Sequence, residues 1–225
     1  MGDARRVAEW TTTGAVVVLA VCAAALTMGN VRRAFFPSPV TLTEPADSVP
    51  NWYDYSVGGN RVGPSRAPVT LTVFNDYQCP VCLRLHGRVE AIRRVYPDDV
   101  AVVWRNMPLE THPLAMPAAR ASVCAGEEGR FEAMHLLLFL MRDSLDVVSW
   151  PRLALRAGIA DTVAFGACVR RAETQARIDS DLAAARAIRA PGTPTLLVNE
   201  LKYVGAPADL ARIVRHVLRR AARAG

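Results

Sequence analysis

The sequence predicts an α/β protein in which a mixed sheet of four to five strands is interrupted by a block of helices, with one N-terminal transmembrane helix before it. Apolar, β-branched runs near residues 69–74 and 100–104 predict two buried strands, and shorter runs at 196–198 and 202–204 predict a closing hairpin. The residues from about 113 to 189 contain no strand-like run, and their apolar positions recur at helical intervals. The closing hairpin cannot extend a doubly wound sheet, but it can complete a four-stranded mixed sheet.

The composition is that of a folded domain. Of 225 residues, 51% are hydrophobic and 21% are charged, which excludes a disordered or low-complexity chain. The net charge of +6 does not predict nucleic-acid binding, because the basic residues are spread along the chain and form no recognisable motif.

Residues 1–35 predict a membrane anchor. No residue from Trp10 to Val31 is charged, and a helix rising about 1.5 Å per residue would cross a hydrocarbon core of about 30 Å over this length. A cleaved signal peptide is the alternative, since Ala23–Ala25 contains a small-x-small site after the basic pair Arg5–Arg6. The uncharged run continues past that site, which favours an uncleaved anchor.

The remaining chain divides into two parts. Residues 36–66 are rich in proline and glycine and predict a linker with a lead-in arm. Residues 67–225 predict the domain itself, with the helical insertion at about 113–189. Helical spacing also predicts a helix from Cys79 to Tyr96 and an amphipathic helix over 208–222.

The motif Cys79-Pro80-Val81-Cys82 stands where the first predicted strand gives way to a helix. A cysteine at a helix start lies beside unpaired backbone N–H groups and the positive end of the helix dipole, which favour the reactive thiolate. Cysteines at positions i and i+3 are also close enough for a disulfide. The pattern therefore predicts redox chemistry, with Cys79 as the exposed nucleophile and Cys82 as the resolving thiol.

Two other interpretations of this motif are a zinc half-site and an inert structural disulfide. Zinc needs four ligands, and the sequence offers no second CxxC or H-x₃₋₅-H motif to complete a site, although His86 could add a third ligand. Structural disulfides seldom need this spacing at a helix start. Redox catalysis is the favoured prediction, and no metal site is predicted.

A second motif, Gly192-Thr193-Pro194-Thr195, precedes the closing hairpin. Together with the run Phe74–Cys82, and with His112-Pro113 and Cys124–Phe131 between them, it resembles the DsbA-like branch of thioredoxin-fold thiol–disulfide oxidoreductases. The resemblance covers roughly residues 52 to 220.

The resemblance implies a thioredoxin fold and a role for each motif. Cys79 and Cys82 match the active pair of the family, and Pro194 matches its cis-proline. Thr193 matches the residue before it, whose backbone pairs with an extended substrate peptide. The dipeptide Pro80-Val81 departs from members that carry a histidine there. We therefore expect a less extreme thiol pKa and a less oxidising couple than in the strongest oxidants of the family.

Two further cysteines, Cys124 and Cys168, fall in the two halves of the helical block. In the oxidising compartment that the resemblance implies, we expect them to form a structural disulfide. Two separate buried thiols are the alternative.

These predictions together describe a single-pass, membrane-anchored thiol–disulfide oxidoreductase with its catalytic domain outside the cytoplasm. Its partners would be exported cysteine-containing polypeptides and, as the family implies, a membrane quinone-linked thiol oxidase that recharges it. No cofactor is required. A reductase of the same fold, fed with electrons across the membrane, and a redox-inert peptide-binding module are the alternatives.

Overall fold

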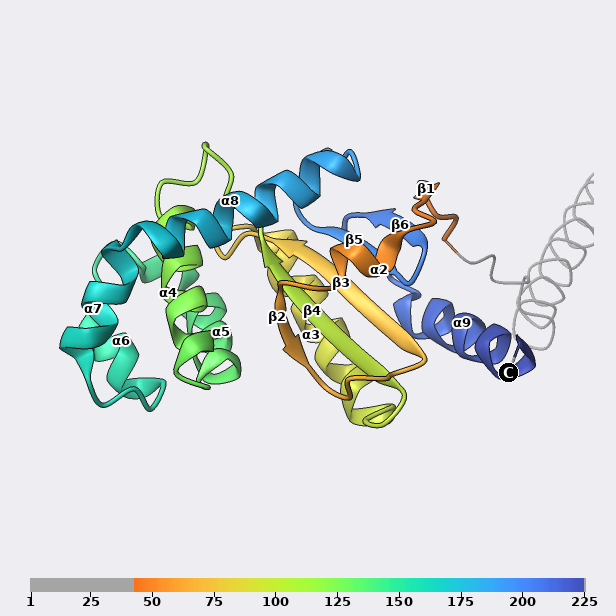
Figure 1. The fold of residues 1–225 in the computed structure, drawn as a ribbon, viewed down its shortest axis with the longest axis horizontal. Helices are drawn as coiled ribbons and strands as arrows, with labels where there is room; N and C mark the ends of the chain where they lie inside the picture. Colours follow the sequence, from red (N-terminus) through yellow and green to blue (C-terminus); the bar gives the residue numbers. More distant parts are fainter. Residues whose placement is uncertain (1–42, 225) are drawn as a thin grey trace, which may run out of the picture. The chain divides into compact units, whose positions relative to one another are not determined.

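The computed structural model describes residues 43–224, and its centre is a β-α-β unit (Figure 1). Strand β3 (Val69–Asn75) is followed by helix α3 (Pro80–Val95) and by strand β4 (Val100–Asn106), which pairs in parallel with β3. Every residue of both strands is buried, as expected for parallel strands that are covered on both faces.

The hairpin that closes the sheet follows the helical block. Strand β5 (Thr195–Val198) pairs antiparallel with β3, and β6 (Leu201–Val204) pairs antiparallel with β5. The full strand order is β1-β6-β5-β3-β4-β2. The predicted mixed sheet with a late hairpin is therefore confirmed.

The sheet has six strands rather than the four to five predicted, because the lead-in arm adds one short strand to each edge. Strand β1 (Asp47–Ser48) pairs with β6, and β2 (Asn60–Val62) pairs with β4, with the short helix α2 (Trp52–Tyr55) between them. Strands of two and three residues in a stretch rich in proline and glycine carry no alternating pattern, so the sequence gives no signal for them.

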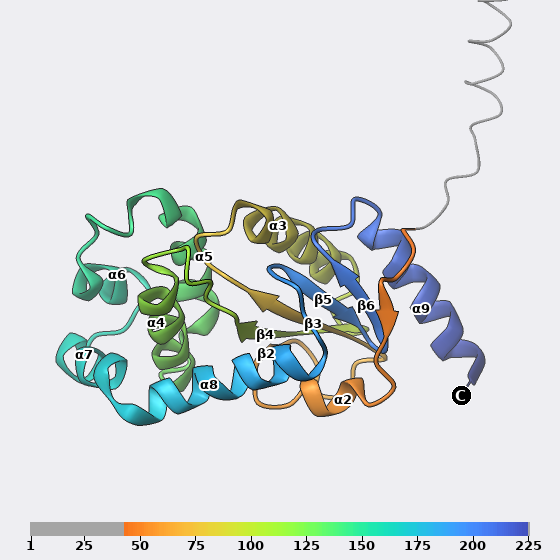
Figure 2. The same ribbon diagram turned by 90° about the horizontal axis from the view of Figure 1, so that it is seen from above.

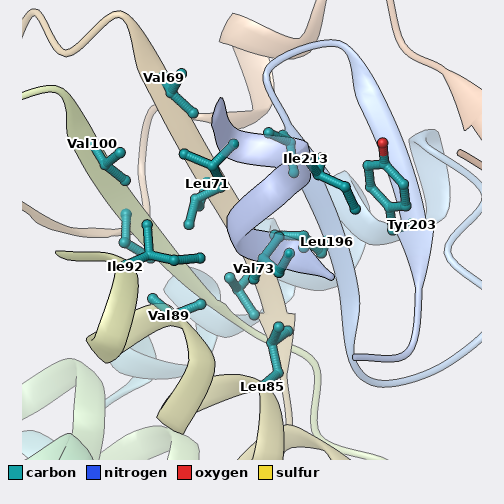
Figure 3. Packing of buried hydrophobic residues seen from close by; sticks show 14 of the residues in the cluster. Val69, Leu71, Val73, Leu85, Val89, Ile92, Val100, Leu196, Tyr203 and Ile213 are labelled. Carbon is teal, nitrogen blue, oxygen red and sulfur yellow. The ribbon is translucent and has the colours of Figure 1, made fainter. Parts of the chain in front are cut away.

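Helices cover both faces of the sheet (Figure 2). On one face, α3 and the C-terminal helix α9 (Leu210–Ala224) pack against apolar side chains of the central strands, and Figure 3 shows this core with side chains such as Leu71, Leu85, Val89 and Ile213. On the other face, α8 (Ala172–Ala187) and α2 pack around Phe74 and Leu197. Burial of these side chains is the main force that holds the layers together.

The helical insertion consists of five α-helices, from α4 to α8, between β4 and β5. Before α8 come α4 (Ala115–Glu127), α5 (Phe131–Leu140), α6 (Trp150–Arg156) and α7 (Thr162–Arg170), with a 3-10 turn over Arg142–Ser144. The long helix α8 is tied to the sheet by a buried ion pair, in which Arg105 Nη1 of β4 lies 2.9 Å from Asp181 Oδ1.

A disulfide joins Cys124 of α4 to Cys168 of α7, across 44 positions of sequence. We expect the double variant Cys124→Ala/Cys168→Ala to lower the free energy of unfolding by roughly 3–4 kcal/mol, because the unfolded chain is no longer constrained by this loop. Urea unfolding would measure the change, with Cys79→Ser and Cys82→Ser present in both proteins to prevent disulfide exchange. A loss below about 1 kcal/mol would show that the bond does not restrict the unfolded chain.

The predicted anchor, residues 1–35, lies outside the described residues. In the part of the chain that the structure describes, no helix is both long enough and apolar enough to span a bilayer.

Candidate active site

Cys79 and Cys82 lie at the start of α3, at the end of β3 that faces the helical insertion. Cys79 is the N-cap residue of the helix, and Pro80 occupies its first turn, where no N–H group needs a partner. Both thiols are free and mostly covered, with 5% of Cys79 and 1% of Cys82 exposed. Cys79 is therefore the more accessible of the two sulfurs, although it is less exposed than the sequence predicts.

The surroundings give the two thiols opposite acidities. Hydrogen bonding from the Cys82 thiol lowers the pKa of Cys79 to about 5, and the backbone N–H groups of Cys82 and Val81 act in the same direction, while burial opposes them. Burial raises the pKa of Cys82, and hydrogen bonding to Cys79 raises it further. Cys79 is thus the thiolate at neutral pH, and Cys82 is the proton donor beside it.

The loop before β5 lies against these sulfurs. The Thr193–Pro194 peptide bond is cis, and Cys79 Sγ lies 3.4 Å from the carbonyl oxygen of Thr193. The Thr193 hydroxyl is buried beside this pair and has no hydrogen-bond partner in residues 43–224, and the Thr193 side chain contributes to the lowering of the Cys79 pKa. The structure thus brings together the four residues that the sequence singles out in its two motifs.

A buried carboxylate that the sequence analysis did not identify organises the turn before Cys79. Asp76 is 1% exposed, and its oxygens accept hydrogen bonds from the backbone N–H groups of Gln78 at 2.7 Å and Leu109 at 2.9 Å. Nδ1 of His112 lies 2.8 Å from Asp76 Oδ2. In addition, the backbone N–H of Asp76 lies 3.5 Å from Cys82 Sγ. Asp76 therefore fixes the loop 107–114 against the active-site turn.

Behind this turn lies a chain of three hydrogen-bonding rings. Tyr77 Oη is 2.8 Å from Nδ1 of His135, and Nε2 of His135 is 3.2 Å from Nδ1 of His86. Burial lowers the pKa of both histidines, so both are neutral at pH 7. His135 is 3% exposed and packs against Trp104 and Phe139.

The Cys124–Cys168 disulfide is separate from the Cys79–Cys82 pair and lies within the insertion. Residues 43–224 contain no group of three or more histidine, cysteine, aspartate or glutamate side chains arranged to hold a metal ion.

Asp76 and Gln78 could have been found from one signal. Both belong to the stretch Asn75–Gln78, which lies between a buried strand and the cysteine motif. A carboxylate in such a place is buried and therefore needs several hydrogen-bond donors. Their partners in loop 107–114 are about thirty residues away in sequence, so only the fold reveals them.

Comparison with known proteins supports the same fold. A family model described as "Thioredoxin" matches residues 56–215. A curated relative, the Na(+)/H(+) antiporter NhaA 1 of Mycolicibacterium gilvum, is 39% identical over 152 residues, which are 66% of this chain and 24% of the antiporter. The chain thus corresponds to about a quarter of the length of that relative.

Two solved structures are similar over most of their length. A periplasmic thioredoxin-like protein from Salmonella enterica serovar Typhimurium has a TM-score of 0.63 and 26% identity, covering 74% of this chain and 95% of its own. The catalytic domain of Proteus mirabilis ScsC has a TM-score of 0.66 and 24% identity, covering 75% and 96%. The family match spans strands β2 to β6, the cysteine pair and the inserted helices, so the chain belongs to the thioredoxin family.

Proposed function

We propose that this chain is a membrane-anchored, extracytoplasmic thiol–disulfide oxidoreductase that introduces disulfides into exported proteins through Cys79 and Cys82. Residues 1–35 would form the anchor, residues 36–66 the linker and arm, and residues 67–225 the catalytic domain. Thr193 and Pro194 would bind the substrate.

The observation that carries this proposal is the depressed pKa of Cys79, about 5. A stabilised thiolate favours the reduced form of the pair, and a pair whose reduced form is stabilised is an oxidant of other thiols. The same property makes Cys79 a good leaving group when the product disulfide forms. Both effects favour net transfer of the disulfide from this chain to a client protein.

The reaction follows from the two acidities. A client thiolate attacks Cys79 Sγ of the oxidised pair, which breaks the Cys79–Cys82 bond and forms a mixed disulfide. Cys82 leaves and takes up a proton, because burial raises its pKa. A second client thiolate then attacks the client sulfur of the mixed disulfide and releases Cys79 as a thiolate. The client dithiol loses two electrons and the chain gains them.

Substrate binding is supported by the loop at Thr193. The backbone N–H of Thr193 has no hydrogen bond within residues 43–224, and its carbonyl oxygen has one hydrogen-bond partner in those residues, Cys79 Sγ. An extended client segment could therefore pair with this backbone while its cysteine lies over Cys79.

The compartment is supported by two observations. The Salmonella protein of similar fold is described as periplasmic, and a structural disulfide such as Cys124–Cys168 is typical of an oxidising compartment. The uncharged run of residues 10–31 supports the anchor. The recharging partner would be a quinone-linked thiol oxidase of the same membrane.

Equilibration of the purified protein with glutathione buffers tests the direction of transfer. We expect a potential for the Cys79–Cys82 couple between about −200 and −120 mV, less oxidising than the strongest oxidants of this fold. A potential near −270 mV, the value of thioredoxin, would overturn the oxidase assignment and favour the reductase. Absence of a reversible couple would favour a redox-inert peptide-binding module.

A further inference from the structure

The C-terminal helix α9 differs from the other long helices in its charge. Its exposed arginines are Arg212, Arg215, Arg219, Arg220 and Arg223, and Leu210–Ala224 contains no acidic residue. In contrast, α3 and α8 carry acidic side chains next to their arginines, as in the pair of Arg93 with Glu90 at 2.9 Å and that of Arg177 with Asp181 at 3.3 Å.

Most of these charges have no counterion in the described part of the chain. Arg220 lies 3.5 Å from Glu200, and Arg212 interacts electrostatically with Asp209. No acidic group of residues 43–224 lies within 4 Å of the guanidinium groups of Arg215, Arg219 and Arg223. The opposite side of α9 is apolar, with Ile213, Val214 and Val217 buried against the sheet and α3. The helix therefore presents a basic face outward while its apolar face holds it to the domain.

The described chain begins beside this helix. The backbone N–H of Thr43 donates to Asp209 Oδ2 at 2.8 Å, and the Thr43 hydroxyl donates to Oδ1 at 2.5 Å, immediately before α9. Only the eleven residues from Arg32 to Leu42 separate Thr43 from the uncharged run that ends at Val31. Such a segment reaches at most about 40 Å when fully extended.

We infer that the basic face of α9 docks on the phosphate groups of anionic phospholipids in the membrane that holds the anchor. This inference rests on the proposed N-terminal anchor. A tether that ends beside α9 keeps this helix within reach of the bilayer surface, and arginines without counterions are attracted to an anionic surface. Because the exposed face contributes charge rather than large apolar side chains, the contact would be electrostatic and would weaken with salt.

Docking through α9 would also orient the active site. Helix α9 packs along the C-terminal half of α3, where Ile92, Val95 and Tyr96 line a shared groove with Leu210 and Arg215. Cys79 lies at the other end of the 16-residue helix α3, about 20 Å along its axis. Figures 1 and 2 show α9 at one end of the domain and α6 and α7 of the insertion at the other. The cysteine pair would therefore face away from the lipid, toward exported chains.

The test uses the full chain in lipid nanodiscs of phosphatidylcholine alone or with 30% phosphatidylglycerol. Phenylglyoxal, an uncharged reagent, modifies arginines, and mass spectrometry gives the rate at each position. We expect Arg212, Arg215, Arg219 and Arg223 to react at least about fivefold more slowly in the anionic discs. Exposed Arg152 of α6 should react equally in both discs. The protection should disappear in 0.5 M NaCl, where the Debye length is below about 5 Å.

Two variants that each lose three arginines show whether the protection depends on α9 itself or only on the net charge of the chain. In Arg212→Gln/Arg215→Gln/Arg219→Gln, the protection of Arg223 should be lost. In Arg152→Gln/Arg156→Gln/Arg170→Gln, which removes the same charge from exposed positions of the insertion, it should remain. Thiol exchange by both variants in detergent should match that of the unmodified chain.

Equal reactivity of the α9 arginines in the two kinds of disc would overturn the inference and leave the anchor and the redox function standing. A chain that does not enter either disc would overturn the anchor and this inference together. Protection that persists in 0.5 M NaCl would also contradict an electrostatic contact with lipid.

Discussion

Replacing Cys79 with serine is expected to abolish dithiol oxidation, so that a reduced two-cysteine peptide is oxidised no faster than without protein. A serine hydroxyl cannot form the disulfide that the client attacks. The remaining sulfurs of the described domain do not substitute for it, because Cys82 is 1% exposed and its pKa is raised by burial, while Cys124 and Cys168 are bonded to each other. Peptide oxidation followed by mass spectrometry measures the effect.

Replacing Cys82 with alanine should have a different result. The thiolate of Cys79 can still attack a peptide disulfide, forming a mixed disulfide and releasing the second peptide sulfur as a thiolate. Without the Cys82 thiol, residues 43–224 hold no other free thiol to resolve this adduct, so it should accumulate and be visible on a non-reducing gel after alkylation. The matched control is Cys79→Ser, which leaves Cys82 in place. If that control also formed the adduct, Cys82 rather than Cys79 would be the nucleophile.

The parts of the fold that were predictable have strong local signals. Strands β3 and β4 are continuous apolar runs, and α3 begins after a strand at a Cys-Pro pair, so both their type and their order follow from the sequence. The helical block was predictable because its residues lack any strand-like run between Pro113 and Arg189. These signals arise from burial of a whole strand, which leaves a continuous apolar run, or of one helix face, which leaves apolar residues at helical intervals.

Features held by single long-range contacts were not predictable. The edge strands β1 and β2 depend on pairing with strands that lie far along the chain, such as Asp47 with Lys202 and Asn60 with Trp104. The role of Asp76 depends on the backbone of Leu109 and on His112, which only the folded loop brings to it. Polar networks of this kind involve one side chain at each position and therefore leave no period to detect.

For the cysteine pair, the sequence predicts the direction of the pKa shift of Cys79 but not its size. Its position at a helix start predicts an acidic thiol at Cys79 without any structure. The extent of the effect could not be predicted, because its largest cause is hydrogen bonding from Cys82, with Thr193 of a loop more than one hundred residues away adding to it. The pKa of Cys79 is thus lowered to about 5 although no histidine stands between the two cysteines.

The reaction of Cys79 with a small neutral disulfide reagent should rise with pH through an inflection near 5 and be flat above about pH 7, because the pKa of this thiol is lowered to about 5. Free cysteine, with a pKa of about 8.5, should continue to gain rate up to pH 9. At pH 5 the fraction of thiolate at Cys79 would exceed that of free cysteine by about 1,600-fold. The lower basicity of its thiolate reduces its reactivity by about 40-fold.

The net expectation at pH 5 is therefore a rate about 40-fold above that of free cysteine, whereas near pH 7 the two effects almost cancel. The position of the inflection is the decisive quantity, since partial burial of Cys79 scales the rate equally at every pH. In Cys82→Ala the inflection should move upward, because hydrogen bonding from Cys82 is the largest cause of the shift. An inflection above pH 8 in the unmodified chain would contradict the stabilised thiolate.

The same shift makes the stability of the reduced protein depend on pH. Because the pKa of Cys79 is lower in the folded protein than in the unfolded chain, the unfolded chain binds more protons between about pH 5 and 8.5. The ionised Cys79 thiol therefore stabilises the fold. This contribution to the free energy of unfolding is fully present above about pH 8.5 and is lost as the pH falls through 5. Urea unfolding of the reduced chain and of Cys79→Ser at pH 5 and pH 8 measures this contribution as the difference between the two proteins. If that difference were the same at both pH values, the thiolate would contribute nothing to the fold, and the preference of the pair for its reduced form would need another cause.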